Sequence, residues 1–238
     1  MIEAFERYVS NYDMNDINIK LKYDHSYRVM ELNKKYATLL GWNKEDIELA
    51  TIIGLLHDIG RFEQLKVYHT YDDFKSVDHA DYSVEQLFDK GLIKEFCNKE
   101  EWYPIIKFAI QNHNKFVISQ CDNERILKHT KLIKDSDKVD IIYLLGTLGE
   151  LNQCCTDDKL TPELMEVFRK RQLVPRNKCI NKNDKILVQY AFVFNVYNDI
   201  CLEDYKKYIT KFHKRMNGGE QFEEVMEIIL NYIDERLC

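Results

Sequence analysis

The stretch Ala50–Phe62, ATIIGLLHDIGRF, decides the fold of this chain. It is an apolar run that ends in an adjacent histidine and aspartate, His57 and Asp58. The apolar residues on both sides of this pair must be buried, and burying a charged carboxylate without a partner is costly. Imidazole and carboxylate are also ligands that borderline divalent metals accept in proteins. The run therefore predicts a helix that carries His57, stops near Gly60 and brings a metal site into the core.

Composition predicts an all-α protein. Of the 238 residues, 45% are apolar and 12% are aromatic, which is enough to form a buried core. With only 8 glycines and 3 prolines, few turns are signalled, and apolar residues recur at helical spacing along almost the whole chain. We therefore expect a bundle of long helices. The one β signal is slight and predicts a short extended piece over Lys115–Ser119.

We expect residues 1–150 to form a metal-binding helical core and residues 151–238 to be a C-terminal helical extension of the same domain. The sequence becomes polar and loop-like at this boundary, up to Thr161. Two strongly amphipathic helices are predicted beyond it, over residues 184–197 and 202–216, followed by a terminal helix. Because no repeat and no Ser/Pro-rich linker sets them apart, we expect these additional helices to pack on the core.

Charge and cysteine content limit the compartment and the partners. The net charge of −6 argues against a general nucleic-acid-binding protein, since phosphate backbones need a basic surface. No signal peptide is evident, and no stretch reaches the roughly 18 to 20 apolar residues of a membrane span. Seven cysteines, an odd number without a CxxC pair, favour free thiols. We therefore expect a cytoplasmic protein with neither a nucleic-acid nor a membrane partner.

Further histidines and an aspartate lie at intervals that suit a helical bundle. They are His25 upstream of the pair, and His79, His113 and Asp137 downstream of it. Each interval fits one helix, a turn and a returning helix, so all five segments can converge on one point. The order H…HD…H…H…D is far more specific than any one of its members.

This order resembles that of the HD-domain superfamily of metallohydrolases, over roughly residues 20 to 145. The resemblance implies a first metal bound by His25, His57, Asp58 and Asp137, and a second bound by His79 and His113, with Asp58 bridging both. Asp137 is chosen because DSDKVD matches the family's D-A-D-x-x-D stretch. We therefore expect two divalent transition metals per chain, with manganese, iron, nickel, cobalt and zinc as the alternatives.

The resemblance also implies a metal-dependent phosphohydrolase, either a phosphomonoesterase or a phosphodiesterase. A hydroxide held between the metals would attack phosphorus in line with the leaving alkoxide, while the metals offset the charge of the transition state. Asp58 and Arg61 are the residues expected to take part in catalysis. Because no second module accompanies the domain, the expected substrate is small: a nucleotide or another phosphate ester.

Arg61, three positions after Asp58, has two interpretations. Many relatives place a basic residue there to contact substrate phosphate, whereas a cation at a helix C-terminus also favours the helix dipole by itself. The segment after it resembles a subgroup of small bacterial HD proteins in the motifs R-F-x-Q, aromatic-x-T and S-x-D-H. That likeness places further residues in the pocket or its lid: Gln64, Tyr68, Thr70, Asp73 and Ser76. Lys115 is a weaker candidate for phosphate binding.

Two other functions stay open on the sequence. Some HD proteins are oxygenases with a di-iron pair whose ligands look identical in sequence, so iron content, oxygen uptake and phosphate release would separate the two activities. A non-catalytic, nucleotide-binding regulatory module is the least favoured, because all the expected ligands are present. The amphipathic C-terminal helices either close the core or form the face of a homodimer.

Overall fold

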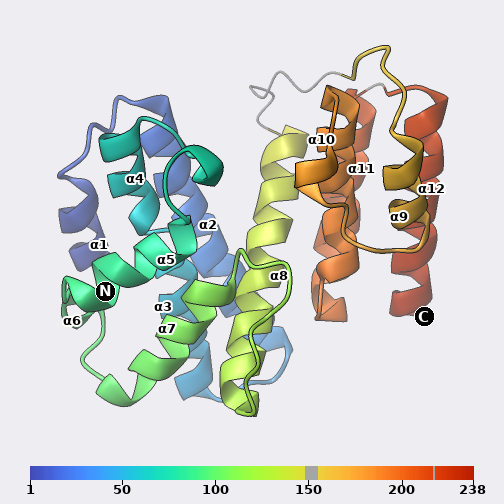
Figure 1. Cartoon of the computed structure of the whole chain (residues 1–238). Coiled ribbons are helices and arrows are strands. Elements are labelled where there is room, and N and C mark those ends of the chain that lie inside the picture. The colour runs from blue at the N-terminus through green and yellow to red at the C-terminus, as the bar shows by residue number, and fades with distance from the viewer. Residues whose placement is uncertain (148–154, 217) are drawn as a thin grey trace. The chain divides into compact units, whose positions relative to one another are not determined.

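The computed structural model describes residues 1–147, 155–216 and 218–238, which form helices joined by turns and loops (Figure 1). No strand occurs in these residues, so the predicted all-α fold is confirmed. The chain divides into two compact units, Met1–Ser136 and Asp137–Cys238, and their boundary falls inside helix α8 (Glu124–Thr147). None of the described helices is both long enough and apolar enough to cross a membrane.

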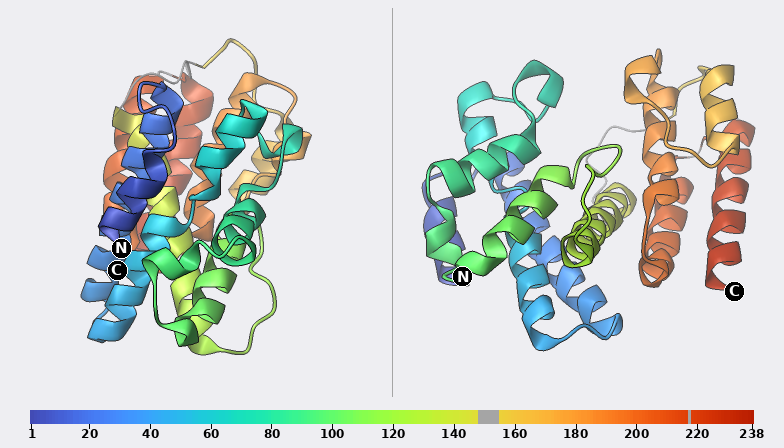
Figure 2. Two further views of the ribbon diagram at one scale, coloured as in Figure 1. Left: turned by 90° about the vertical axis from the view of Figure 1, so that its left-hand side faces the viewer. Right: turned by 60° about the horizontal axis from the view of Figure 1, so that its bottom comes forward.

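The first unit contains the N-terminal part of α8 and the helices before it. These are α1 (Ile2–Val9), α2 (Ile17–Leu39), α3 (Lys44–Leu56), α4 (Gly60–Tyr68), α5 (His79–Val84), α6 (Ile93–Phe96) and α7 (Tyr103–Asn112). Helices α2 and α3 pack along each other, and α5 packs against α4 and α7 (Figure 2). The predicted ligands lie within α2, just after α3, at the start of α5 and just after α7, and this arrangement brings them toward one region.

Capping residues set the ends of α2 and α3. The side chain of Asp16 accepts a hydrogen bond from the Asn18 amide at the start of α2. Gly41 follows the helix with a φ of +69°, a left-handed conformation that glycine adopts without strain. Asn43 then caps α3 by accepting a hydrogen bond of 2.8 Å from the Asp46 amide. The long helix pair of the first unit is therefore delimited by local sequence signals.

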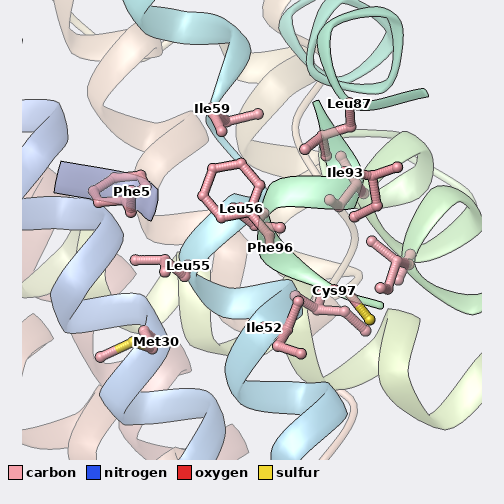
Figure 3. Close-up of a cluster of buried hydrophobic side chains, with 14 of the residues drawn as sticks. Phe5, Met30, Ile52, Leu55, Leu56, Ile59, Leu87, Ile93, Phe96 and Cys97 are labelled. Carbon is pink, nitrogen blue, oxygen red and sulfur yellow. The ribbon is translucent and has the colours of Figure 1, made fainter. Parts of the chain in front are cut away.

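An apolar core lies between the helices of the first unit (Figure 3). Its buried side chains include Phe5, Met30, Ile52, Leu55, Leu56, Ile59, Leu87, Ile93 and Phe96. Those from the ATIIGLLHDIGRF run are fully buried on both sides of the His57-Asp58 pair. Each such side chain contributes about 1.5–3 kcal/mol through the removal of apolar surface from water. The core therefore fixes the segment that carries the pair.

Two glycines allow close packing on either side of this pair. A Cβ atom on Gly54 would lie 2.8 Å from Met30 Cα on α2, and one on Gly60 would lie 2.6 Å from Ser83 N on α5. Helix α3, which is expected to carry His57 and stop near Gly60, ends earlier, at Leu56, and a turn over residues 57–59 leads into α4. Gly60 thus lies at the start of α4, where its backbone packs directly on α5.

The segment Lys115–Ser119 is not extended into a strand, so that expectation is wrong: it forms bends and coil. The Ser119 amide donates to Asn112 Oδ1 at 2.8 Å, and the Lys115 amide donates to the carbonyl oxygen of Asn112 at 3.3 Å. The side chains of Phe116 and Val117 are exposed. A run of apolar residues in this segment therefore does not indicate a buried strand, because two of its three apolar side chains are exposed.

The second unit contains the end of α8 and helices α9 (Pro162–Arg169), α10 (Lys182–Tyr190), α11 (Leu202–Met216) and α12 (Glu220–Leu237). The helix predicted over residues 184–197 is shorter, because α10 gives way to a 3-10 turn over Ala191–Asn195. The unit has buried aromatic side chains of its own: Phe168, Tyr190, Tyr205, Phe212 and Phe222. That 151–238 extends the same domain as 1–150 stays a prediction.

Candidate metal centre

Five predicted ligands converge in the interior of the first unit. His25 lies within α2, His79 begins α5, and His113 directly follows α7. His57 and Asp58 lie in the turn between α3 and α4. All five residues are buried. Side chains from four separate parts of the chain therefore meet where bulk water is largely excluded.

The first group consists of His25, His57 and Asp58. The Nε2 atoms of the two histidines are 3.2 Å apart. The Oδ2 atom of Asp58 lies 3.5 Å from His25 Nε2 and 3.7 Å from His57 Nε2. Two atoms that each lie about 2.1 Å from one ion are about 3.0–3.4 Å apart at tetrahedral or octahedral angles. The spacing of this group is therefore close to that of a metal site.

The second group consists of Asp58, His79 and His113. The Nε2 atoms of His79 and His113 are 3.1 Å apart, and Asp58 Oδ1 is 3.6 Å from each of them. The two oxygens of Asp58 thus face different pairs of histidines. A carboxylate placed in this way is suited to be a ligand that two metals share.

Hydrogen bonds to the far side of the rings fix the tautomers of two histidines. The Nδ1 atom of His57 lies 2.8 Å from the carbonyl oxygen of Gly54, and that of His113 lies 2.7 Å from the carbonyl oxygen of Ile110. Because a carbonyl only accepts, we assign the proton to Nδ1 and the lone pair to Nε2 in both rings. Burial lowers the pKa of His113 to about 4, so this ring is neutral near pH 7.

His79 is oriented by a carboxylate instead. Its Nδ1 atom lies 2.5 Å from Asp73 Oδ2, which leaves the lone pair of Nε2 facing His113. Two Nε2 lone pairs that face each other repel unless a cation lies between them. The second group is therefore favourable when it binds a metal or a proton.

Asp58 gives an independent test of whether a metal fits here. Its Oδ1 atom is buried and has no hydrogen-bond partner among the described residues. Burial would raise the pKa of Asp58, but Lys22 and the neighbouring histidines outweigh that effect and hold the pKa well below its usual range. A buried, charged and unsatisfied oxygen beside imidazole lone pairs requires a cation. The residues present therefore fit a divalent metal.

Lys22 is a charged neighbour that the sequence analysis misses. Its Nζ atom lies 2.7 Å from Asp58 Oδ2, and its side chain is 16% exposed. The one signal for it in the sequence is its position three residues before His25, which puts both residues on one face of α2.

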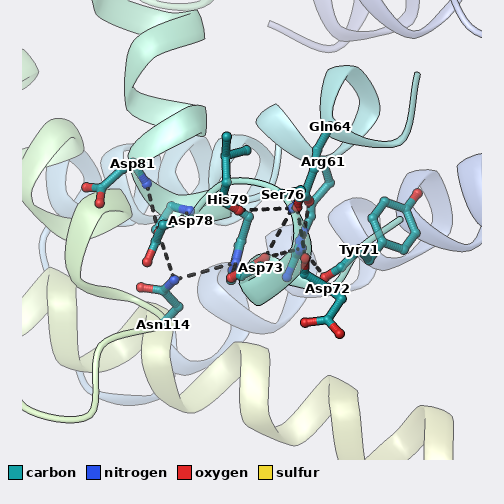
Figure 4. A network of polar contacts seen from close by, with 12 residues as sticks. Arg61, Gln64, Tyr71, Asp72, Asp73, Ser76, Asp78, His79, Asp81 and Asn114 are labelled. Atoms are coloured by element: carbon teal, nitrogen blue, oxygen red, sulfur yellow. Dashed lines mark hydrogen bonds and ion pairs between the residues drawn. The ribbon is translucent and has the colours of Figure 1, made fainter. Parts of the chain in front are cut away.

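Arg61 lies in the first turn of α4, so its interpretation as a cation at a helix C-terminus is wrong. The dipole disfavours a cation at this end of a helix, and specific partners hold it instead. Its Nη1 atom donates to Gln64 Oε1, to the carbonyl oxygen of Tyr71 and to Asp73 Oδ1, at 2.7, 2.8 and 2.8 Å (Figure 4). Its Nε atom is 3.8 Å from Asp58 Oδ1. Arg61 is therefore fixed beside both groups.

The predicted pocket residues Gln64 and Ser76 lie in the same polar network (Figure 4). Gln64 is fully buried, and its Nε2 atom donates to Ser76 Oγ at 2.8 Å and to the carbonyl oxygen of Val77 at 3.1 Å. The hydroxyl of Ser76 donates to the carbonyl oxygen of Asp72 at 2.9 Å. These side chains tie the segment before α5 to α4. Their contact with a substrate stays a prediction.

Two further predicted pocket residues lie at the start of this segment. Thr70 Oγ1 accepts a hydrogen bond of 3.1 Å from the Asp72 amide, and the ring of Tyr68 contacts that of Tyr82 with centroids 6.4 Å apart. Tyr68 is exposed, whereas Thr70 is half-buried. Both residues are thus available at the surface of α4 and the segment after it.

Lys115, the weaker phosphate candidate, is paired with two carboxylates of the α5 N-terminus. Its Nζ atom lies 2.8 Å from Asp78 Oδ2 and 3.2 Å from Asp81 Oδ2. Burial would lower the pKa of Lys115, but these carboxylates outweigh it and raise the pKa.

Lys134, which the sequence analysis also misses, donates to the carbonyl oxygens of Asn112 and Lys115 at the C-terminal end of α7. It thereby holds the backbone around His113.

Asp137, the last predicted ligand, lies on α8 where the second unit begins, and it is half-buried. It has interactions of its own within the protein. Its assignment to the first metal stays a prediction.

The family of the chain follows from its sequence. A model of the HD domain family matches residues 23–142, which include every predicted metal ligand. No curated protein and no solved structure matches the chain. HD domains are in general metal-dependent phosphohydrolases, and the two His/Asp groups are compatible with divalent metals. Because the match spans half of the chain and contains the residues that meet in the core, the protein belongs to the HD domain family.

Proposed function

We propose that the protein is a metal-dependent phosphohydrolase that acts on a nucleotide or another small phosphate ester. The observation that supports this most directly is the position of Asp58, whose two oxygens face different pairs of histidine Nε2 atoms. Such a carboxylate can serve two metals at once, as phosphoryl-transfer sites with two metals require.

The proposed ligands of the first metal are His25, His57, Asp58 and Asp137, and those of the second are Asp58, His79 and His113. Two divalent metals bound there would lower the pKa of a water molecule and offset the negative charge of the phosphoryl oxygens. Manganese, iron, nickel, cobalt and zinc all accept imidazole and carboxylate ligands, so the choice depends on supply.

The chain's own residues prepare this chemistry. Hydrogen bonds that Nδ1 donates hold His57, His79 and His113 with their Nε2 lone pairs directed inward. Arg61 is a fixed guanidinium beside Asp58, and its Nε atom has no hydrogen-bond partner among the described residues. We assign Arg61 to contact with the phosphoryl group, since a guanidinium suits two oxygens of one phosphate. A fixed phosphoryl group is what an in-line displacement needs.

The test combines metal content with hydrolysis. The full chain, purified without chelator, is analysed for transition metals and then assayed for phosphate release from nucleotides and for nitrophenol release from p-nitrophenyl phosphate and bis-p-nitrophenyl phosphate. We expect about two metals per chain and hydrolysis of at least one ester class. Iron together with oxygen uptake, and without hydrolysis, would support the di-iron oxygenase instead.

Variants locate the activity at the proposed site. Asp58→Ala should lose metal and hydrolysis, and His113→Ala should keep about one metal of two. The matched control is Asp24→Ala, because Asp24 is an exposed carboxylate on α2 that pairs with Lys20. An Asp58→Ala variant with full metal content would refute the ligand assignment, and one with full hydrolysis would refute the function.

A further inference from the structure

Two cationic side chains flank Asp58 from different helices. Lys22 on α2 contacts Asp58 Oδ2 at 2.7 Å, and Arg61 on α4 approaches Oδ1 at 3.8 Å. Each carboxylate oxygen therefore faces one cation as well as one pair of histidines. The side chains of Lys22 and Arg61 are 16% and 11% exposed, so neither is a freely solvated surface charge.

The ring of Tyr71 holds these two cations near each other. Lys22 Nζ lies 5.7 Å from its centroid and Arg61 Cζ lies 5.5 Å from it, within the range of cation–π attraction. The hydroxyl of Tyr71 donates a hydrogen bond of 2.9 Å to the carbonyl oxygen of Asn18, one turn before Lys22 on α2. Tyr71 is thus fixed to the helix that carries Lys22, while its own backbone carbonyl accepts from Arg61.

The anionic partners of the two cations differ. Arg61 is paired with Asp73 at 2.8 Å, which offsets its charge independently of Asp58. Asp58 is the one ionic partner of Lys22 within the described part of the chain. If Asp58 is a metal ligand, its single negative charge is shared with divalent cations, and the ammonium group of Lys22 is left in excess. A largely buried ammonium in excess requires another anion.

We infer that Lys22 is a phosphoryl-binding residue, which together with Arg61 forms a cationic subsite for the oxygens of the substrate's phosphate group. This inference rests on the proposed function and names the group that recognises its substrate. An ammonium offers three donors in variable directions and the guanidinium a fixed fork, so the pair suits a tetrahedral oxyanion. The competing role for Lys22 is structural, as a counter-charge that keeps Asp58 in place.

The experiment measures inorganic phosphate binding to the manganese-loaded full chain by calorimetry, after a manganese titration of the same variant. Lys22→Gln should weaken phosphate binding by about 10- to 100-fold, the size of a hydrogen bond to a charged group. Its manganese affinity should be equal or higher, because a neighbouring positive charge has been removed. Lys22→Arg should recover most of the phosphate affinity. Lys20→Gln is the matched control, since Lys20 is exposed on the same helix and pairs with Asp24.

Each outcome decides between the two roles. Unchanged phosphate affinity in Lys22→Gln, or a loss of manganese in parallel with phosphate, overturns the inference. No phosphate binding by the manganese-loaded wild type also overturns it, although hydrolysis of a larger ester would still uphold the proposed function. Conversely, Lys22-dependent phosphate binding without hydrolysis of any ester supports the subsite and refutes the phosphohydrolase.

Discussion

The Nδ1 atom of His79 lies 2.5 Å from the Oδ2 atom of Asp73, a residue of the short turn that precedes α5. In His57 and His113 the same nitrogen pairs with a backbone carbonyl. A carboxylate partner raises the basicity of a metal-binding imidazole more than a carbonyl does. The group that contains His79 therefore depends on a charged residue outside the ligand set, and the two candidate metals are not equivalent.

Replacing Asp73 by asparagine should lower the affinity for the metal held by His79 and His113 by about 10- to 100-fold and leave the affinity for the other metal unchanged. Asparagine can still accept the hydrogen bond, but it lacks the charge that makes the ring a better donor. Calorimetric titration of Mn²⁺ into chelator-treated protein would resolve the two affinities. Asp72→Asn is the control, because Asp72 caps the Phe74 amide. Equal losses of both metals in Asp73→Asn would mean that Asp73 supports the fold and not His79.

The convergence of the histidines and Asp58 is predictable because their residue types and intervals carry the information. Lys22 is different, since a lysine on a helix is ordinary and its contact with Asp58 depends on how α2 lies against the turn after α3. Likewise, Gln64 and Ser76 are recognisable as polar residues near the ligands, but only tertiary packing shows that they bond to each other. Local sequence thus predicts which residues gather and misses what surrounds them.

Asp46 shows the same limit for a stabilising cluster and leads to a prediction. Its carboxylate is buried and accepts from Arg125 Nε at 2.7 Å, Lys128 Nζ at 2.6 Å and His129 Nε2 at 3.2 Å, all on α8. Asp46→Ala removes the one acceptor that these donors share, although Arg125 and Lys128 are about one-third exposed and regain water. We expect the free energy of unfolding to fall by about 2–4 kcal/mol in urea titrations.

Glu45→Ala provides the comparison for Asp46→Ala. Glu45 is exposed and accepts from Arg125 Nη2 at 2.8 Å and from Trp102 Nε1 at 2.9 Å, so its removal should lower the free energy of unfolding by less than the removal of Asp46. Similar losses in the two variants would show that burial of Asp46 does not set the strength of this cluster.

His129 predicts how stability depends on pH. Burial lowers its pKa to about 4, against about 6.5 in an unfolded chain. Between these values the unfolded chain binds more protons than the folded one, so stability should fall as the pH drops from about 6.5 to about 4. The free energy of unfolding can be measured by urea titration of manganese-saturated protein at several pH values in this range. It should change less steeply with pH in His129→Gln than in the wild type. Because both proteins keep the same metal ligands, parallel slopes would exclude His129 as the cause.

Gly60 connects the turn that carries Asp58 with the helix that carries His79. Its amide donates to Ser83 Oγ at 3.0 Å, that hydroxyl donates to the carbonyl oxygen of His79 at 2.8 Å, and a Cβ on Gly60 would lie 2.6 Å from Ser83 N. Gly60→Ala must therefore push the turn and α5 apart. It should cost about 1–3 kcal/mol of stability in urea unfolding and weaken Mn²⁺ binding. Gly91→Ala, where a Cβ would meet nothing within 4 Å but φ is +76°, should cost about 1 kcal/mol and leave Mn²⁺ affinity unchanged. If Gly60→Ala also keeps full Mn²⁺ affinity, the contact between Gly60 and Ser83 does not set the spacing of Asp58 and His79.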